Sequence, residues 1–244
     1  MADKSPISTP APTPAPTPSS GPANRARVLG AVRAALGRGP LPTGRAQGLD
    51  ATLARHQRHT IPARGRADDL VAAFASAASG VAAEVLHLAS LDEVPAALAD
   101  HLASLNLPPA LRLAPDPALA ALPWHTRPLL AVEVGTGVPG VQVGLALAEA
   151  GVAETGTLVL TSGAERSTTL NFVPDVQYVI LPHGRLDGAL EDAWARLRNA
   201  HGAAWPPRTV NLVTGPSRTG DIEQTMIMGA HGPRRLVILM VPGA

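Results

Sequence analysis

Three strand-length runs of apolar residues in the second half of the chain are what most limits the folds it can adopt. They are Val141–Ala148, Val176–Leu181 and Leu236–Val241. Apolar residues follow one another in these runs without the alternation typical of a half-exposed strand, so both faces of each strand should be buried. Helical segments predicted between the strands can cover those faces. The pattern therefore predicts an α/β fold, with a layered, largely parallel sheet flanked by helices.

The remaining elements of this fold are predicted from apolar periodicity and from turn residues. Helical spacing predicts helices over Asp68–Ser79, Leu91–Ser104, Pro115–Ala121, Asp187–Ala200 and Thr219–Met228, the last ending at Gly229. Shorter β-rich segments predict strands at Ala83–Leu88, Leu111–Ala114, Gly156–Leu160 and Thr209–Val213. Together these elements form a domain over residues 68–244.

Two segments precede this domain. Residues 1–23 are rich in Pro, Ala and Thr, and alternating proline with little to bury predicts a disordered tail or, alternatively, a Pro-rich docking motif. Residues 24–67 are predicted to form an N-terminal helical arm, in which Asn24 caps a helix over Arg25–Leu36 that stops at Gly37. The irregular, arginine-rich stretch 37–67 is either a solvated arm or a segment that docks on an acidic partner or a second subunit.

Composition excludes several classes of function. The chain has no cysteine, which rules out disulfides, thiolate metal or iron–sulfur sites built from this chain alone, and a cysteine nucleophile. Lys4 is its single lysine, so the folded part has neither a Schiff-base lysine nor a P-loop lysine. The formal net charge is +1 and aromatic residues make up 2%, which argues against nucleic-acid binding. His56 and His59 have no third ligand nearby in sequence, so no metal site is predicted.

The location expected from the sequence is the cytoplasm. The first residues, MADKSP, lack the apolar region of a secretory signal. The apolar stretch Leu236–Val241 is far shorter than the ~20 residues of a membrane-spanning helix.

The first candidate site is the segment Glu154-Thr155-Gly156-Thr157, where a loop enters a predicted strand. Ligands bind at strand ends in open α/β sheets. Glu154 could act there as a general base or a nucleophile, the two threonine hydroxyls could bind a ligand, and Gly156 would allow close approach. The alternative is a turn whose polar residues satisfy backbone groups.

The second candidate site follows a buried strand and opens a predicted helix. A helix N-terminus with hydroxyl and guanidinium donors suits an anionic ligand. Helix capping by Thr219, Asp221 and Glu223 is the alternative, but capping leaves Arg218 unexplained. The candidate ligand-binding residues are Gly215, Ser217, Arg218, Thr219, Asp221 and Glu223.

The third candidate is His231, in the turn that precedes the last strand. Its imidazole could be an acid/base group or could contact an anion. The alternative is a structural turn histidine. No G-x-S-x-G nucleophile elbow, P-loop or dinucleotide-binding fingerprint occurs in the sequence.

Three segments in this order resemble the lactate-utilisation (LUD) domain family, with the lactate utilisation protein C group as the nearest. They are AETGTLVLTSG, LNFVPDVQYVILP and TGPSRTGDIEQTMIMGAHGPRRLVILM. The resemblance covers residues 130–244 closely and 68–129 loosely, while the tail and the basic arm lie outside it. It implies a fold similar to the superfamily of CoA transferases and ribose-5-phosphate isomerase. Glu154 to Thr157, Ser217 to Thr219, Asp221 and Glu223 match positions in the family's motifs.

The resemblance also implies a process, the oxidation of L-lactate to pyruvate by a system whose other components are iron–sulfur proteins. This chain would be the cluster-free component, holding no cofactor itself and binding a small organic anion, a phosphate or its partner subunits. Two alternatives stay open. One is an independent enzyme of the sugar-phosphate isomerase or CoA-transferase type, in which Glu154 is the catalytic base or nucleophile. The other is a non-catalytic regulatory or interaction module.

Overall fold

The structure is a computed structural model that describes residues 22–37, 39–220 and 226–243. The chain divides into two units, Met1–Gln57 and Arg58–Ala244. The tail expected over residues 1–23 lies outside the described residues, except for Pro22 and Ala23, which begin helix α1 (Pro22–Ala35). The boundaries expected at 23/24 and 67/68 stay predictions. The structure groups residues 58–67 with the second unit.

The first unit contains a helix that the sequence did not predict. Residues 43–55, expected to be irregular, form α2 (Thr43–Arg55). Gly44 and Gly48 lower helix propensity, but they cost only about 1 kcal/mol each, and Pro42 precedes the first turn without disturbing it. No residue of α2 is buried, and Leu49 and Leu53 are exposed.

The second unit is built on a six-stranded sheet in which all the paired strands run parallel. Its strand order is β1-β12-β7-β4-β2-β3. The strands are β1 (Glu84–His87), β2 (Ala110–Leu113), β3 (Ala131–Val134), β4 (Val143–Leu147), β7 (Val176–Pro182) and β12 (Arg235–Val241). The three apolar runs of the sequence lie at its centre as β4, β7 and β12. The predicted parallel α/β fold is therefore confirmed.

A second sheet of four strands was not predicted as a separate layer. Its order is β8-β5-β6-β9, and β6 pairs antiparallel with both of its neighbours. The strands are β5 (Ala150–Val152), β6 (Thr157–Thr161), β8 (Leu186–Asp187) and β9 (Val210–Val213). The strands expected at 156–160 and 209–213 thus belong to this sheet. Every residue of β6 is buried because both of its faces are covered, so its sequence resembles that of a central parallel strand.

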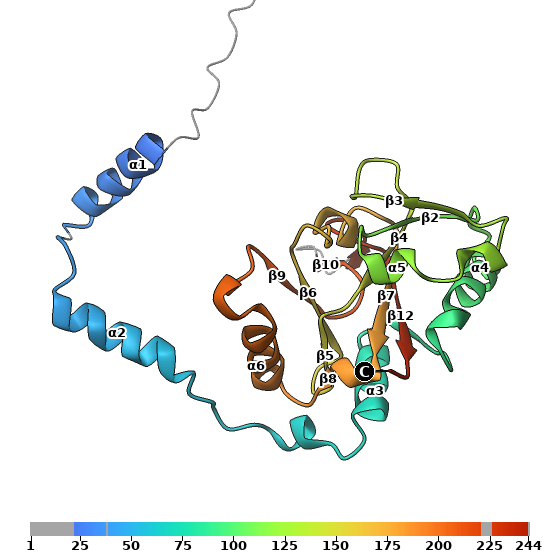
Figure 1. Cartoon of the computed structure of the whole chain (residues 1–244), viewed down its shortest axis with the longest axis horizontal. Coiled ribbons are helices and arrows are strands. Elements are labelled where there is room, and N and C mark those ends of the chain that lie inside the picture. The colour runs from blue at the N-terminus through green and yellow to red at the C-terminus, as the bar shows by residue number, and fades with distance from the viewer. Residues whose placement is uncertain (1–21, 38, 221–225, 244) are drawn as a thin grey trace, which may run out of the picture. The chain divides into compact units, whose positions relative to one another are not determined.

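Helices cover the two sheets from both sides (Figure 1). On one face of the main sheet, α4 (Val94–Ser104) and α5 (Pro117–Ala120) pack against Leu145, Ile180 and Leu239. On the other face, α3 (Leu70–Gly80) and β6 pack against Val179 and Ile238. The outer face of the second sheet is covered by α6 (Leu190–His201). Asp69 caps α3, with its carboxylate accepting from the N–H of Ala72 at 3.0 Å.

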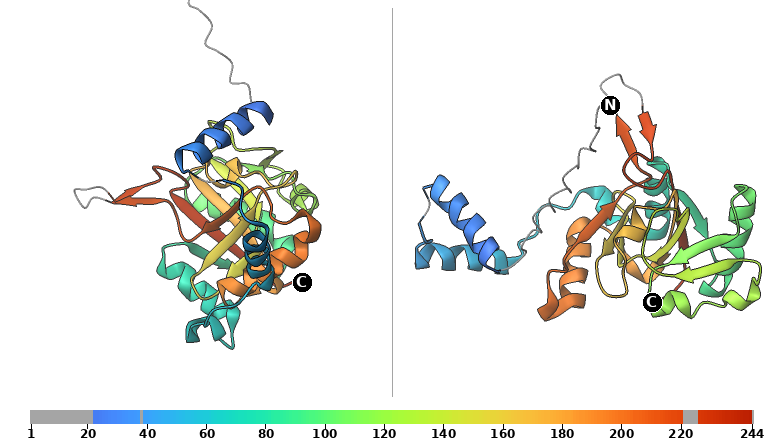
Figure 2. Two further views of the ribbon diagram at one scale, coloured as in Figure 1. Left: turned by 90° about the vertical axis from the view of Figure 1, so that its left-hand side faces the viewer. Right: turned by 90° about the horizontal axis from the view of Figure 1, so that it is seen from above.

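The helix expected over Thr219–Met228 is wrong. The described residues there form an antiparallel hairpin of β10 (Arg218–Gly220) and β11 (Met226–Met228), which projects from the second unit (Figure 2). Residues 221–225, with Asp221 and Glu223, lie outside the described residues. Strand pairing between Arg218 and Met228 overrides the weak helical pattern. Gly229, expected to end a helix, has a positive φ of 79° just after β11.

No helix in the described ranges is both long and apolar enough to cross a lipid bilayer.

Candidate functional site

Glu154 lies in the tight turn between β5 and β6, where a residue from the basic arm pairs with it. Its Oε1 accepts from Nε of Arg64 at 3.0 Å, and the Glu154 side chain is only 11% exposed. Arg58 pairs in the same way with Asp192 on α6. The arginine-rich stretch was interpreted either as a solvated arm or as a segment that docks on an acidic partner. Arg58 and Arg64 do pair with acidic side chains, but these side chains belong to the same chain.

Position 156 in this turn requires a glycine because helix α3 packs directly against it. Its φ is +66°, and a Cβ at this position would lie 2.3 Å from the backbone nitrogen of Ala78 in α3. The close approach that was expected for a ligand is therefore made by α3. This packing fixes the turn that carries Glu154 against the end of α3.

Three threonine hydroxyls connect the first candidate segment to the loop after β9. Oγ1 of Thr157 lies 2.6 Å from Oγ1 of Thr155 and 2.7 Å from Oγ1 of Thr214. Thr157 is buried, whereas Thr155 and Thr214 are exposed. The structure thus brings the first and second motifs side by side, as their shared position at strand ends suggested.

Arg218 does not lie at a helix N-terminus, contrary to the prediction from the sequence, but begins strand β10. Its Nη2 donates to the carbonyl oxygen of Val81 at 2.7 Å, and Val81 is the C-terminal cap residue of α3. A cation beside a helix C-terminus is favourable. Gly215, with φ +75°, lies so close that a Cβ would be 2.3 Å from the same oxygen. The loop is therefore anchored on the end of α3.

Ser217 and His231 lie where two loops meet. The N–H of Ser217 donates to the carbonyl of Pro233 at 2.8 Å, and its carbonyl accepts from the N–H of Gly229 at 3.0 Å. The Ser217 hydroxyl accepts a longer bond, 3.4 Å, from the N–H of His231. These bonds hold His231 beside the loop that carries Arg218.

Glu154 and Arg218 line different cavities, so the single cleft expected between them is not what the structure has. The first, here called the turn cavity, has a volume of about 430 Å³ and is lined by Thr60, Pro62, Glu154, Thr155, Thr157, Leu190, Glu191, Leu212 and Thr214. The second, the loop cavity, has a volume of about 290 Å³. It contains the candidate residues Gly215, Ser217, Arg218, Thr219 and His231. The two cavities share only Leu212 and Thr214.

The loop cavity combines apolar walls with basic and uncharged polar side chains. Arg218 and His231 are the ionisable groups among its described lining residues, and none of those residues is acidic. Two carboxamides that the sequence argument missed, Asn171 and Gln177, also line it. A polar Gln inside the apolar run that forms β7 was the available signal. This arrangement suits a ligand with an anionic group and an apolar part.

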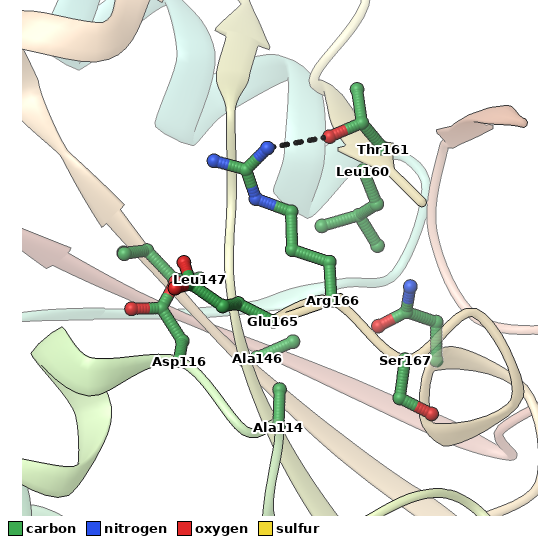
Figure 3. Close-up of a pocket in the computed structure, with 10 residues that line it drawn as sticks. Ala114, Asp116, Ala146, Leu147, Leu160, Thr161, Glu165, Arg166 and Ser167 are labelled. Carbon is green, nitrogen blue, oxygen red and sulfur yellow. Dashed lines mark hydrogen bonds between the residues drawn. The ribbon is translucent and has the colours of Figure 1, made fainter. Parts of the chain in front are cut away.

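A third cavity lies at the carboxyl ends of β2 and β4 (Figure 3). The strands β2 and β4 are adjacent, and the next strand of this sheet along the chain lies on opposite sides of them, β3 beside β2 and β7 beside β4. Ligands of parallel α/β sheets bind at such a switch point. Arg166 lines this cavity, with Nη1 lying 2.7 Å from Oε2 of Glu149 and 3.1 Å from Oγ1 of Thr161. The remaining volume of about 10 Å³ is the space of one water molecule.

A partly buried polar chain connects α4 with β7, β1 and β12 of the main sheet, away from all three cavities. Nδ1 of His101 lies 2.8 Å from the hydroxyl of Tyr178, and Nε2 lies 3.1 Å from Glu84, which also pairs with Arg235. Burial raises the pKa of the Tyr178 hydroxyl, and the charge of Glu84 raises the pKa further, while Arg235 opposes the shift. Within the described parts of the chain, no group of three His, Asp or Glu side chains is gathered to hold a metal ion.

Comparisons with known proteins agree with this architecture. Residues 71–241 match the protein-family model of the LUD domain. A lactate utilization protein C of Geobacillus thermodenitrificans is 34% identical over 100 residues, which cover 41% of this chain and 42% of that protein. An uncharacterized protein of Neisseria meningitidis is 37% identical over 101 residues, covering 41% and 42%. The chain thus matches about two fifths of the length of these curated relatives.

A solved structure shares the fold. A crystal structure of a DUF162 family protein from Deinococcus radiodurans superposes with a TM-score of 0.51 at 19% identity, covering 74% of this chain and 99% of that one.

Proposed function

Because the chain belongs to the LUD domain family, we propose that it is the cluster-free component of a system that oxidises L-lactate to pyruvate, and that it binds a small organic anion in the loop cavity. Relatives named lactate utilization protein C support the process. The observation that supports the ligand is the cavity itself, in which Arg218 and His231 face a lining without described acidic residues.

Redox chemistry in this proposal comes from partner proteins. Electron transfer needs a metal, flavin or nicotinamide group. The chain has no cysteine with which to ligate an iron–sulfur cluster. In this proposal the partners are the iron–sulfur proteins that the resemblance to the lactate-utilisation family implies, and the role of this chain is to bind the anion or to hold the assembly together.

The separation of the two cavities bears on the alternative of an independent enzyme. An isomerase or transferase of the kind considered would need the Glu154 carboxylate close to the group that binds the substrate anion. Glu154 is instead paired with Arg64 and lines the turn cavity, whereas Arg218 lines the loop cavity. The geometry thus favours binding over catalysis by Glu154.

Growth on lactate tests the proposal. A strain lacking the gene should fail to grow on L-lactate as sole carbon source, and the full-length chain should restore growth. The Arg218→Gln variant should restore it poorly, because the cavity loses its permanent cation. Arg208→Gln is the matched control, since Arg208 is exposed and lines none of the cavities described above. Normal growth of the deleted strain, with no second lactate pathway present, would refute the proposal.

A further inference from the structure

Helix α1 of the first unit has an exposed apolar face. The side chains of Val28, Val32 and Leu36 are 49%, 49% and 57% exposed. They are four residues apart, so they lie on one side of a helix. Leu36 follows α1 directly, and its N–H donates to the carbonyl of Val32 at 3.0 Å, which continues the helical turn. Three large apolar side chains therefore line up along one exposed face.

Positive charge flanks this apolar face. Arg25 and Arg33 are both exposed, and the eight residues between them span about 12 Å along a helix. The unit as a whole is basic, because residues 1–57 contain seven Lys and Arg side chains and two Asp. A surface that covers this face should therefore be acidic and should accept apolar side chains. A second α1 does not suit, since it would bring like charges together.

Helix α4 of the second unit has an outer face with these properties. Its inner side carries Val94, Leu98 and Leu102, which are fully buried in the core. Asp92, in the turn just before α4, and Asp100 are exposed and are also eight residues apart. Among the described residues, neither carboxylate has an ion-pair partner. The spacing of the two acidic side chains thus matches that of the two arginines.

The surface between the two aspartates is small and apolar. It consists of Ala96, Ala99 and Ala103, none of which is buried. Short side chains let a second helix come close, so the larger apolar side chains of α1 can pack over them. The charge of the whole unit is also complementary, because residues 58–244 contain 13 Lys and Arg side chains against 17 Asp and Glu.

The α4 that fits best belongs to a second copy of the chain. Arg58, at which the second unit begins, pairs with Asp192 on α6, and α6 covers the outer face of the second sheet. Helix α4 packs on the opposite face of the main sheet, so both sheets lie between α6 and α4 (Figure 1). A second copy offers the same surface without this obstacle, and reciprocal docking gives two identical interfaces related by a twofold axis.

We propose that α1 docks on the outer face of α4 in a second copy of this chain. Arg25 and Arg33 pair with the two aspartates of α4, and the apolar side chains of α1 cover its alanines. A protein surface is favoured over a lipid surface because residues 1–57 contain no Trp, Tyr or Phe, the aromatic residues typical of helices that lie in a membrane interface. Residues 1–57 lie outside the match to the LUD domain, so this interface goes beyond the function proposed above.

Sedimentation equilibrium of the full-length chain tests the proposal. We expect dimers at about 50 mM salt and weaker association as added salt screens the charges. The double variant Arg25→Glu/Arg33→Glu should raise the dimer dissociation constant at least about tenfold, because each attraction becomes a repulsion. Asp92→Arg/Asp100→Arg should have an effect of the same size.

Mixing the two double variants gives the sharper result. An equimolar mixture should recover dimers, because each α1 then meets an α4 of opposite charge. An α1 that folded back on the α4 of its own chain would not produce this recovery. Arg27→Glu/Arg45→Glu is the matched control and should dimerise nearly as well as the unaltered chain. It makes the same change in charge, but Arg27 lies off the apolar face, where it bonds to Asn24, and Arg45 belongs to α2.

Circular dichroism checks that every variant is folded. Asp100→Arg alone replaces the double variant if Asp92→Arg disturbs the start of α4. A chain that stays monomeric at low salt, a dimer that neither reversal weakens, or a mixture that stays monomeric would overturn the inference. A monomer that binds phosphatidylglycerol vesicles would also overturn it and would assign α1 to a lipid surface.

Discussion

Oγ1 of Thr157 lies 2.7 Å from Oγ1 of Thr214, and this contact connects the turn that carries Glu154 with the loop that carries Arg218. Thr157 belongs to β6, whereas Thr214 follows β9, its antiparallel neighbour. The shared hydroxyl chain lies on the boundary between the turn cavity and the loop cavity. The two motifs are therefore joined directly by hydrogen bonds between small side chains.

We expect Thr157→Val to lower the free energy of unfolding by about 1 kcal/mol, because Thr157 is buried and bonds to hydroxyls on both sides. Thr214→Val should cost less, since Thr214 is exposed and water can replace its bond. Urea denaturation of both single variants and the double variant measures their coupling. Strict additivity would show that the contact contributes nothing.

Gly156→Ala should be severely destabilising, by more than about 2 kcal/mol, because its Cβ would collide with the backbone of α3 as well as strain a positive φ. Gly140→Ala is the matched control. It also has a positive φ, +92°, but its Cβ would meet nothing within 4 Å. Thermal unfolding of the two variants should separate the collision from the backbone strain. Similar losses in both would refute the assigned role of α3.

The raised pKa of Tyr178 predicts a stability loss at high pH. An unfolded tyrosine ionises near pH 10, while the folded hydroxyl keeps its proton to higher pH because it is buried. The unfolded state alone therefore releases this proton as the pH rises above about 10, and the free energy of unfolding falls. Tyr178→Phe should remove this part of the pH dependence. The variant should also cost about 1 kcal/mol at neutral pH, where His101 loses a partner.

Tyr178 is the single tyrosine of the chain, so its ionisation can be followed directly by ultraviolet absorbance. The tyrosinate signal should appear together with unfolding. A signal that rises near pH 10 in the folded protein would contradict the prediction.

Glu154→Gln should leave ligand binding in the loop cavity unchanged, because Glu154 lines the other cavity. Its stability cost should be below about 1 kcal/mol, since the partner Arg64 is 70% exposed and its charge is largely screened. Calorimetry with L-lactate and urea denaturation check the two parts. Loss of lactate binding would return Glu154 to the site.

Much of the fold follows from the sequence because burial on both faces leaves a readable signature. The apolar runs of β4, β7 and β12 give the parallel sheet directly. A continuous apolar run shows that a strand is buried on both faces, but it does not show which sheet the strand joins. The antiparallel pairing of β6 was therefore not predicted. The hairpin at Arg218 was missed because strand pairing depends on a partner several residues away, which local periodicity does not report.

The candidate site was predictable only in part. Motif residues such as Ser217 and His231 do line one cavity. The placement of Arg218 at a helix N-terminus was wrong, because the residue lies in a hairpin strand and its partner, the carbonyl of Val81, lies 137 positions earlier in the chain. Asn171 and Gln177 were missed because an uncharged amide in an apolar segment has no motif of its own, and only the structure shows that they line the loop cavity.

The arm that pairs with Glu154 and Asp192 has a practical consequence for anyone who shortens this protein. The family match begins at residue 71, and a chain trimmed to that point would lose both Arg58 and Arg64. The carboxylates of Asp192 and Glu154 would then lose the arginines that pair with them. Gly65, which is buried against Ala189, would also be lost. An isolated domain should therefore start before Arg58, well upstream of where sequence similarity alone would set the cut.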